Sequence, residues 1–438
     1  MTEATLPQGG PAESTPRRGI AASLRAAGVD MRLLGMFLVL GVIWIGFHIV
    51  SDGGFITPRN LWNLSVQSSS IGIMATGMVL IIVARNIDLS VGAILGFVGY
   101  SMAMMQTIWI PLSFGFGLEQ PWAWVVTVAF GILLGALLGL IQGFIVAYLG
   151  VPSFIVTLGG LLVWRGLIFQ YVQGQTLAPL DSTFRLLGGG PLGSVGEQLS
   201  WVIGALVCVA IVYALITNRR RRKRYGFAMR PIVAEVAIGI VACGAVLLAV
   251  ATANSYYWPE NLANDFADAN GIPIPEGGLL IPTGIANPVL ILLGVGAVMT
   301  YIATRRRFGR NVYAIGGNPD AALLSGINVK RTIMYTFGLM GLLAAVSAVV
   351  QTARLNAAVT GLGVSNELDV ISAAVIGGTS FAGGIGTIPG AILGAVVMQS
   401  LRSGMLLLNV DSPVQDIVVG IVLVAAVGFD AWLRRRST

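Results

Sequence analysis

The sequence predicts an all-α membrane protein: a polytopic transmembrane helical bundle of ten to twelve membrane segments, which could include half-helix or re-entrant segments. Hydrophobic residues make up 55% of the 438 positions and charged residues 10%, against about a quarter charged in soluble domains. Glycine is abundant, with 58 residues, and small residues let helices approach closely where lipid gives no hydrophobic drive for association. The third observation is a one-sided distribution of positive charge.

Lysine and arginine separate onto two sides of the predicted bundle. Of the 26 residues, 21 fall in tails and connections on one side, three (Arg59, Arg185 and Arg354) fall on the other, and Arg165 and Arg402 lie inside apolar segments. Because positive charge is retained on the cytoplasmic face, this bias predicts a multi-pass membrane protein with both termini in the cytoplasm. It also accounts for the net charge of +7, so we expect no nucleic-acid partner.

Each crossing requires about 20 apolar residues. Residues 1–30 are polar, rich in Pro and Gly and without apolar periodicity, which predicts a disordered cytoplasmic tail. A transmembrane domain follows over 31–433, and 434–438 form a short cytoplasmic end. The predicted segments are 33–50, 62–84, 88–110, 122–148, 153–172, 199–217, 231–253, 287–304, 332–353, 367–381, 390–408 and 413–433.

Two of these segments are irregular, because 153–172 contains Arg165 and 367–381 is too short to cross alone. Either could be a half-helix or re-entrant segment, which is tolerated where protein buries it or where it lines a water-filled cavity. Arg165 could therefore face a polar path or hydrogen-bond to carbonyls of a broken helix. For Arg402, nearer a segment end, we expect the side chain to extend toward the membrane surface.

Few residues are placed for chemistry. Every Asp and Glu can be assigned to a tail, a loop or the end of a segment, whereas many ion-coupled carriers keep a carboxylate at mid-depth. Lys223 and Lys330 are the two lysines, and neither completes a phosphate-binding loop. Cys208, Cys243 and His48, the one histidine, suggest no metal or catalytic cluster. We expect no catalytic residue, no metal and no cofactor.

Two local patterns predict structure. Glycines at 131, 135, 139 and 143 form a groove on one helix face where another helix can lie close. The cytoplasmic segment 305–331 carries a helix signature, with a capping Asn318, Pro319 at the first position, Asp320 in the first turn and a terminating Gly326. The predicted helix, roughly 319–325, exposes apolar residues 321–324. These either pack on the protein's own cytoplasmic ends or dock into a partner.

Four motifs together resemble one family. They are NIDLSVG at 86–92, VPSFIVTLGG at 151–160, AIGGNPDAALLSGINV at 314–329 and VIGGTSFAGGIGTIPGAILGAV at 375–396. In unchanged order, they resemble the permeases of bacterial ATP-binding-cassette (ABC) importers for sugars, the ribose, xylose and branched-chain amino acid group. Within this group, the chain is most similar to xylose-type permeases, because it has a polybasic linker at 219–224 and two additional segments after QGQTLAP. Arg402 departs from the polar or acidic residue expected in relatives.

The resemblance implies a permease subunit, usually a dimer, that is itself no enzyme. A periplasmic sugar-binding protein would deliver a monosaccharide, such as the pentose D-xylose, to a permease homodimer in the lipid membrane. A separate cytoplasmic ABC ATPase would drive alternating access. Ribose, arabinose or galactose as cargo, an ion-coupled carrier and a passive channel remain alternatives.

The resemblance also assigns residues to roles. The family motif supplies Asp88, Ser90 and Gly92, and residues 254–286 would form a long periplasmic loop. ATPase coupling would fall on Gly317, Asn318, Pro319, Asp320, Ala321, Ala322, Leu323, Ser325 and Gly326. A neutral sugar needs uncharged hydrogen-bonding groups along its route. The expected path residues are Asn63, Gln67, Ser70, Thr157, Thr379 and Ser380, with Arg165 beside them.

Overall fold

The computed structural model describes residues 31–435 apart from 114, 116, 118, 228, 230 and 277. The predicted tail, 1–30, and residues 436–438 of the predicted cytoplasmic end lie outside the described residues. Within the described part the protein is all-α, as predicted, with helices joined by turns and isolated β-bridges.

Nine helices of the described chain are long and apolar enough to cross a membrane. Two further helices, α2 (Met31–Val50) and α17 (Ser412–Arg435), contain shorter apolar stretches. With one short internal helix, these elements follow the twelve predicted segments in order. The nine are α3 (Pro58–Val83), α4 (Val91–Met104) with its π-helical continuation (Met105–Ser113), α5 (Ala123–Tyr148), α6 (Ser153–Val172), α8 (Gly196–Arg224), α9 (Ile232–Asn254), α11 (Asn287–Arg305), α14 (Val329–Leu355) and α16 (Ile388–Leu407).

The two irregular segments differ in outcome. The short internal helix is α15 (Asn366–Ile376), whose 11 residues confirm that this segment is too short to cross alone. It is followed by a loop, 377–387, before α16 begins. By contrast, α6 is a continuous helix of 20 residues. Arg165 therefore lies within an unbroken helix, and the proposed interruption of 153–172 is wrong.

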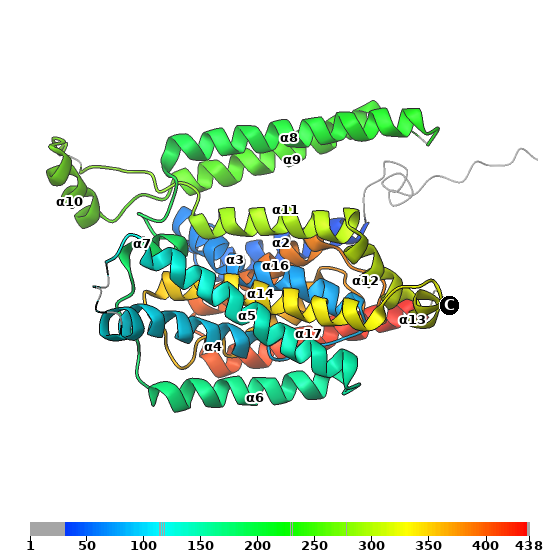
Figure 1. The fold of residues 1–438 in the computed structure, drawn as a ribbon. Coiled ribbons are helices and arrows are strands. Elements are labelled where there is room, and N and C mark those ends of the chain that lie inside the picture. The colour runs from blue at the N-terminus through cyan, green and yellow to red at the C-terminus, as the bar shows by residue number, and fades with distance from the viewer. Residues whose placement is uncertain are drawn as a thin grey trace, which may run out of the picture.

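Helix α3 forms the centre of the bundle. Of its most apolar window, 94% is buried, against 11% for α6, α8 and α9. It packs against α14, α16, α11 and α15, and the first three are labelled beside it in Figure 1. Pro58 at the first position and the Thr57 side chain, which accepts from the Asn60 amide at 3.3 Å, define its start.

The predicted glycine groove lies on α5 and holds α14. A Cβ at Gly139 would collide with the Phe337 carbonyl, and one at Gly143 with the backbone of Met334. Gly135 meets Gly341 of α14 in the same way. The absence of side chains therefore sets a backbone-to-backbone approach between α5 and α14, as expected for small residues in membrane bundles.

Helices α8 and α9 form a hairpin along one edge of the bundle (Figure 1). Little of either helix is buried by the rest of the chain. The loop at 254–286 follows this hairpin and contains a further helix, α10 (Glu260–Asn270). Near this loop, the Trp62 indole of α3 donates to the Gly284 carbonyl at 2.8 Å and ties the loop to the centre.

The bundle has two distinct ends. At one end lie α12 (Arg307–Gly317), α13 (Pro319–Leu324) and the polybasic end of α8, and we call this the basic end (Figure 1). At the other, which we call the opposite end, lie α7 (Ser182–Arg185), the short 3-10 turn Leu186–Gly188 and α10. The central helix α3 runs from the opposite end to the basic end.

Candidate functional site

A polar cavity of about 220 Å³ lies between α3, α14, α15 and α16. Two predicted path residues, Gln67 and Ser70, line it from α3, one turn apart. Because α3 begins and α14 ends near this cavity, it lies nearer the opposite end of the bundle. Its polar lining is Gln67, Ser70, Gln351, Arg354, Asn366 and Gln399.

Hydrogen bonds fix part of this lining. The Gln351 side-chain amide donates to Ser70 Oγ at 2.7 Å, and the Ser347 and Ser70 hydroxyl oxygens are 2.5 Å apart. Asn366 Nδ2 is buried and has no protein partner among the described residues. Since an unmade hydrogen bond at a buried donor is costly, the Asn366 amide has a strong tendency to bind an oxygen-rich ligand or water.

Sequence reasoning missed four of the six polar lining residues. Gln351 and Gln399 lie inside predicted apolar segments, and a polar side chain within such a segment was a signal that could have indicated them. Arg354 directly follows the predicted apolar segment 332–353, so it is expected in a connection and not in a cavity. Asn366 enters the cavity because α15 begins inside the bundle, which sequence spacing does not reveal.

The break between α3 and α4 is built by the family motif. Asp88 is 1% exposed and accepts hydrogen bonds from the Ser90 amide at 2.9 Å and the Ser90 hydroxyl at 2.6 Å. A Cβ at Gly92 would collide with the Gly363 carbonyl and the Glu367 carboxylate. The predicted path residue Thr157 lies here and donates weakly to the Ile87 carbonyl at 3.4 Å. The motif thus shapes a helix start that packs closely against α15.

Arg165 of α6 binds backbone. Its guanidinium donates to the Leu362 carbonyl, in the connection before α15, at 2.7 Å, and it interacts electrostatically with Glu367. The side chain thus hydrogen-bonds to a carbonyl, but this carbonyl belongs to the connection before α15 and not, as the sequence had suggested, to a broken helix. The side chain joins α6 to the start of α15.

Thr379 and Ser380 lie in the 377–387 loop, away from the polar cavity. This loop contacts the basic end of α3, where the Gly384 amide donates to the Val83 carbonyl at 3.0 Å. Sixteen residues separate Gln67 from Val83 on one helix, a rise of roughly 24 Å. Asn63 bonds to Arg59 of its own helix and does not line the cavity. The predicted path residues therefore occupy separate places.

Helices α12 and α13 are held against this same end of α3. Arg85, just after α3, donates to the Gly316 carbonyl at 2.8 Å and to the Gly317 carbonyl at 3.0 Å. Tyr313 of α12 donates to the Gly386 carbonyl at 2.7 Å. Three segments thus converge here: the end of α3, the α12–α13 connection and the 377–387 loop.

The local structure of α13 agrees with its predicted boundaries. Asn318 accepts from the Ala321 amide at 3.0 Å, and Gly326 has φ +82°, a left-handed backbone that favours glycine. Leu324 is 89% exposed, whereas Ala322 is 3% exposed and packs inside the protein. The expectation that Ala322 is exposed is therefore wrong, because this face of α13 turns toward the bundle.

The expected role of Arg402 is also wrong. Instead of extending to the membrane surface, its guanidinium binds Asp369 of α15 at 2.8 Å and Asp416 of α17 at 3.2 Å. Asp369 is 3% exposed, and a buried carboxylate requires such a partner. The ion pairs join three helices, α15, α16 and α17.

These features define a multi-pass membrane permease. Its spanning helices enclose the short internal helix α15 and a polar cavity, and Arg85 holds the α12–α13 connection at the basic end. The chain belongs to the family described as branched-chain amino acid transport system / permease component, which it matches over residues 60–427. It is a multi-pass protein of the bacterial inner membrane, and the relatives it matches are transport permeases, not enzymes.

Among its relatives is the xylose transport system permease protein of Escherichia coli (strain K12), 36% identical over 428 residues and covering 97% of each chain. The Haemophilus influenzae protein of the same name is 36% identical over 403 residues, covering 92% of this chain and 96% of the relative. The ribose import permease protein of Escherichia coli (strain K12) is 30% identical over 393 residues, 90% of this chain and 92% of the relative. The comparison with solved structures gives no match.

The Arg402 network makes a stability prediction. Arg402→Met leaves Asp369 buried without its cation, so we expect a loss of about 3 kcal/mol in the free energy of unfolding. Adding Asp369→Asn removes the buried charge and should restore most of that stability. Thermal unfolding of the purified proteins in detergent measures both changes. A single variant as stable as the parent, or a double variant no better than the single, would contradict the network's role.

Proposed function

We propose that this chain is the permease subunit of an ABC importer that moves a monosaccharide, D-xylose or a closely related pentose, into the cytoplasm. The observation that carries the proposal is the similarity to xylose permeases over 97% of both chains. Ribose import remains the second candidate, because the similarity to the ribose import permease extends over 90% of this chain. The described residues offer no cluster of carboxylates for a coupling ion, but the argument against an ion-coupled carrier rests on the similarity.

We infer that the basic end faces the cytoplasm, since the polybasic end of α8 and the arginines of 305–310 gather there. Segments 1–30, 305–331 and 434–438 would then be cytoplasmic and loop 254–286 periplasmic. In a variant with Cys208 and Cys243 replaced by serine, a cysteine at Asp265 should react with an impermeant reagent on whole cells. A cysteine at Arg220 should react only after the membrane is opened. Equal labelling would refute this orientation.

The partners follow from the two ends. A cytoplasmic ABC ATPase would contact α13, whose Leu323 and Leu324 are 63% and 89% exposed. A periplasmic sugar-binding protein would deliver cargo at the opposite end, and the permease would act as a homodimer. ATP hydrolysis would lie in the ATPase, so this chain would contribute binding and motion.

The contacts at the basic end suggest how motion would be transmitted. A displacement of α13 acts on Gly316 and Gly317, whose carbonyls bind Arg85 at the end of α3. The same displacement acts on the 377–387 loop through Tyr313. Both connections continue to helices that line the polar cavity, α3 directly and α16 after the loop. ATP-driven movement of α13 would thereby shift the cavity between outward and inward states, because the docked ATPase favours one of them.

Leu324→Glu tests this coupling. A charge on the exposed tip of α13 should abolish ATPase co-purification without unfolding the permease, because Leu324 makes little contact with the bundle. With the ATPase and binding protein present, proteoliposomes of the parent should take up D-xylose only when ATP is supplied. Proteoliposomes of the variant should take up no D-xylose, with or without ATP. Val364→Glu, also at an exposed apolar position but in the loop before α15, is the matched control for ATPase binding.

A parent protein that transports D-xylose without ATP would refute the proposed function. Normal ATPase binding by Leu324→Glu would refute only the docking role of α13. Gly326→Val should also abolish ATPase co-purification and uptake, but through backbone strain at the end of α13. The φ of +82° at this position costs a β-branched residue about 1–3 kcal/mol.

The polar cavity is the proposed transit site for the sugar. Its amide and hydroxyl groups, together with the Arg354 guanidinium, can exchange hydrogen bonds with a polyhydroxylated molecule. Gln67→Leu and Gln399→Leu should therefore each slow D-xylose uptake several-fold, without changing the preference between D-xylose and D-ribose. Asn63→Leu, one turn from Gln67 on the same helix, should have a smaller effect because Asn63 does not line the cavity.

Competition uptake assays measure rate and preference together. Equal effects of Gln67→Leu and Asn63→Leu would remove the cavity from the path. A switch of sugar preference by a cavity substitution would make the permease, and not the binding protein, the selectivity filter.

A further inference from the structure

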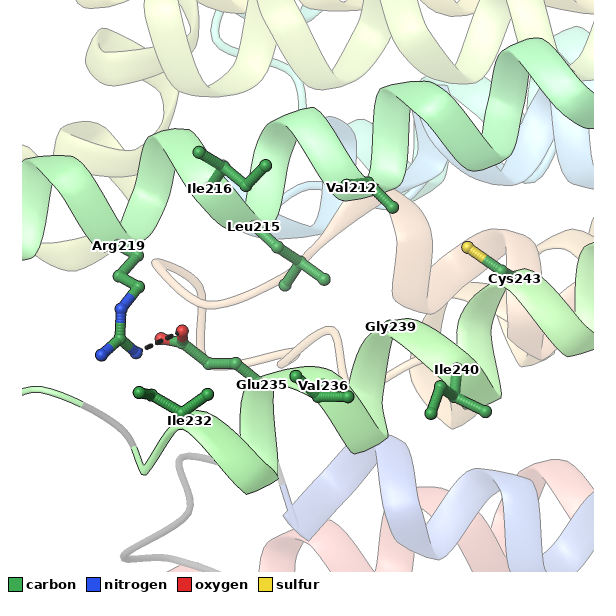
Figure 2. Close-up of a pocket in the computed structure, with 10 residues that line it drawn as sticks. All are labelled: Val212, Leu215, Ile216, Arg219, Ile232, Glu235, Val236, Gly239, Ile240 and Cys243. Atoms are coloured by element: carbon green, nitrogen blue, oxygen red, sulfur yellow. Dashed lines mark hydrogen bonds and ion pairs between the residues drawn. The ribbon is translucent and has the colours of Figure 1, made fainter.

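The α8–α9 hairpin contains an apolar groove that takes no part in the proposed transport cycle. Figure 2 shows its lining, with aliphatic side chains converging from both helices. Val212, Leu215 and Ile216 come from α8, and Val236 and Ile240 from α9, around a space of about 480 Å³. Gly239 lies close to the Leu215 side chain, 3.3 Å from where a Cβ would stand, so the two helices approach each other at the floor of the groove.

One end of the groove is charged. Arg219 of α8 binds Glu235 of α9 at 2.6 Å, and this ion pair forms the groove's end toward the basic end of the bundle (Figure 2). Arg222 lies three residues beyond Arg219 and therefore on the same face of α8. With Arg221 it lines a second space of about 530 Å³, beside Tyr225 and Phe227. The apolar groove thus continues into a cationic surface.

The shape and chemistry of the groove identify the class of molecule that fits. Between Ile232 and Cys243 the groove extends over eleven residues of α9, roughly 16 Å, and a helix with side chains is about 10–12 Å across. The groove is narrower than a whole helix, so a helix could insert only one row of side chains and would leave the charged end of the groove uncovered. A linear hydrocarbon chain fits, and a sugar does not, because the lining offers it almost no hydrogen-bonding groups.

We propose that this groove and the adjoining arginines form a binding site for an anionic phospholipid. One acyl chain lies between α8 and α9, and the phosphate-containing headgroup lies on Arg221 and Arg222. Charge complementarity selects an anionic headgroup, because clustered basic residues next to a membrane segment attract anionic lipids. The apolar groove then adds the hydrophobic energy of the buried chain. The lipid would fill the groove of a hairpin whose surface is mostly left uncovered by the rest of the chain.

Photo-crosslinking of the full-length purified protein tests the site. The probe is phosphatidylglycerol with a diazirine in one acyl chain, compared with phosphatidylcholine carrying the same chains. Peptide mapping should place phosphatidylglycerol labels on 212–219 and 232–243 at a level about five-fold or more above phosphatidylcholine, as about one basic contact would give.

Two variants separate the parts of the site. Arg221→Gln with Arg222→Gln should remove the preference for phosphatidylglycerol and leave acyl-chain labelling at the phosphatidylcholine level. Arg306→Gln with Arg307→Gln, in a basic cluster at the start of α12, is the matched control and should preserve the preference. Val236→Trp should fill the groove and reduce labelling by both lipids, whereas Val241→Trp, on the same helix but outside the groove lining, should not.

Each result decides the proposal. Equal labelling by the two lipids in the parent protein would overturn it, as would equal labelling of Val236→Trp and Val241→Trp. Loss of preference in the Arg306 and Arg307 variant would assign the effect to overall charge and also overturn it. Absence of label from 212–219 and 232–243 with either lipid would leave the groove to another occupant, such as a second copy of the chain, and would exclude the lipid. Circular dichroism and thermal unfolding of every variant confirm that labelling is compared between folded proteins.

Discussion

Buried backbone groups at helix ends impose the constraint on which the rest of this structure depends. Where a helix end is covered by protein, its terminal amides and carbonyls need partners within the protein. The connection 84–90, at the basic end of α3, meets this need through Asp88, which accepts from the Ser90 amide, and through the bond from the Gly384 amide to the Val83 carbonyl. The loop after α15 uses the same end of α3. Satisfying these groups brings α12, the 377–387 loop and the end of α3 to one point.

Much of the architecture could be predicted from local signals. Apolar length located the spanning helices, and Asn318 and Gly326 bounded α13, because caps act within a few residues. The partners of Arg402 could not be predicted in this way. Asp369 lies 33 residues before it and Asp416 14 residues after it, and only the placement of α15 inside the bundle brings them together. Only two of the six polar residues that line the cavity could be predicted, for the same reason: Gln67 and Ser70 share a helix, whereas Gln351 and Asn366 come from distant segments.

Charge in this bundle is used at joints between elements. Arg85 joins α3 to the α12–α13 connection, Arg165 joins α6 to the segment before α15, and Arg402 joins α15 to α16 and α17. The first two bind backbone carbonyls, so their position depends on chain path and not on a particular partner side chain. A guanidinium suits this role, since its several donors can bind adjacent carbonyls at once. These arginines therefore lie where the chain leaves regular helix packing, at connections between helices and at the short helix α15.

The backbone contact between α5 and α14 has a mechanical consequence. Side chains that interdigitate can change rotamer and let two helices slide, but helices in contact through Gly135, Gly139 and Gly341 have no such freedom. A shift along the axis would drive the next residue, which carries a Cβ, into the facing carbonyl. The two helices therefore move as a single rigid body. Whatever changes shape in this protein has to do so elsewhere, at elements that are not held to each other backbone to backbone.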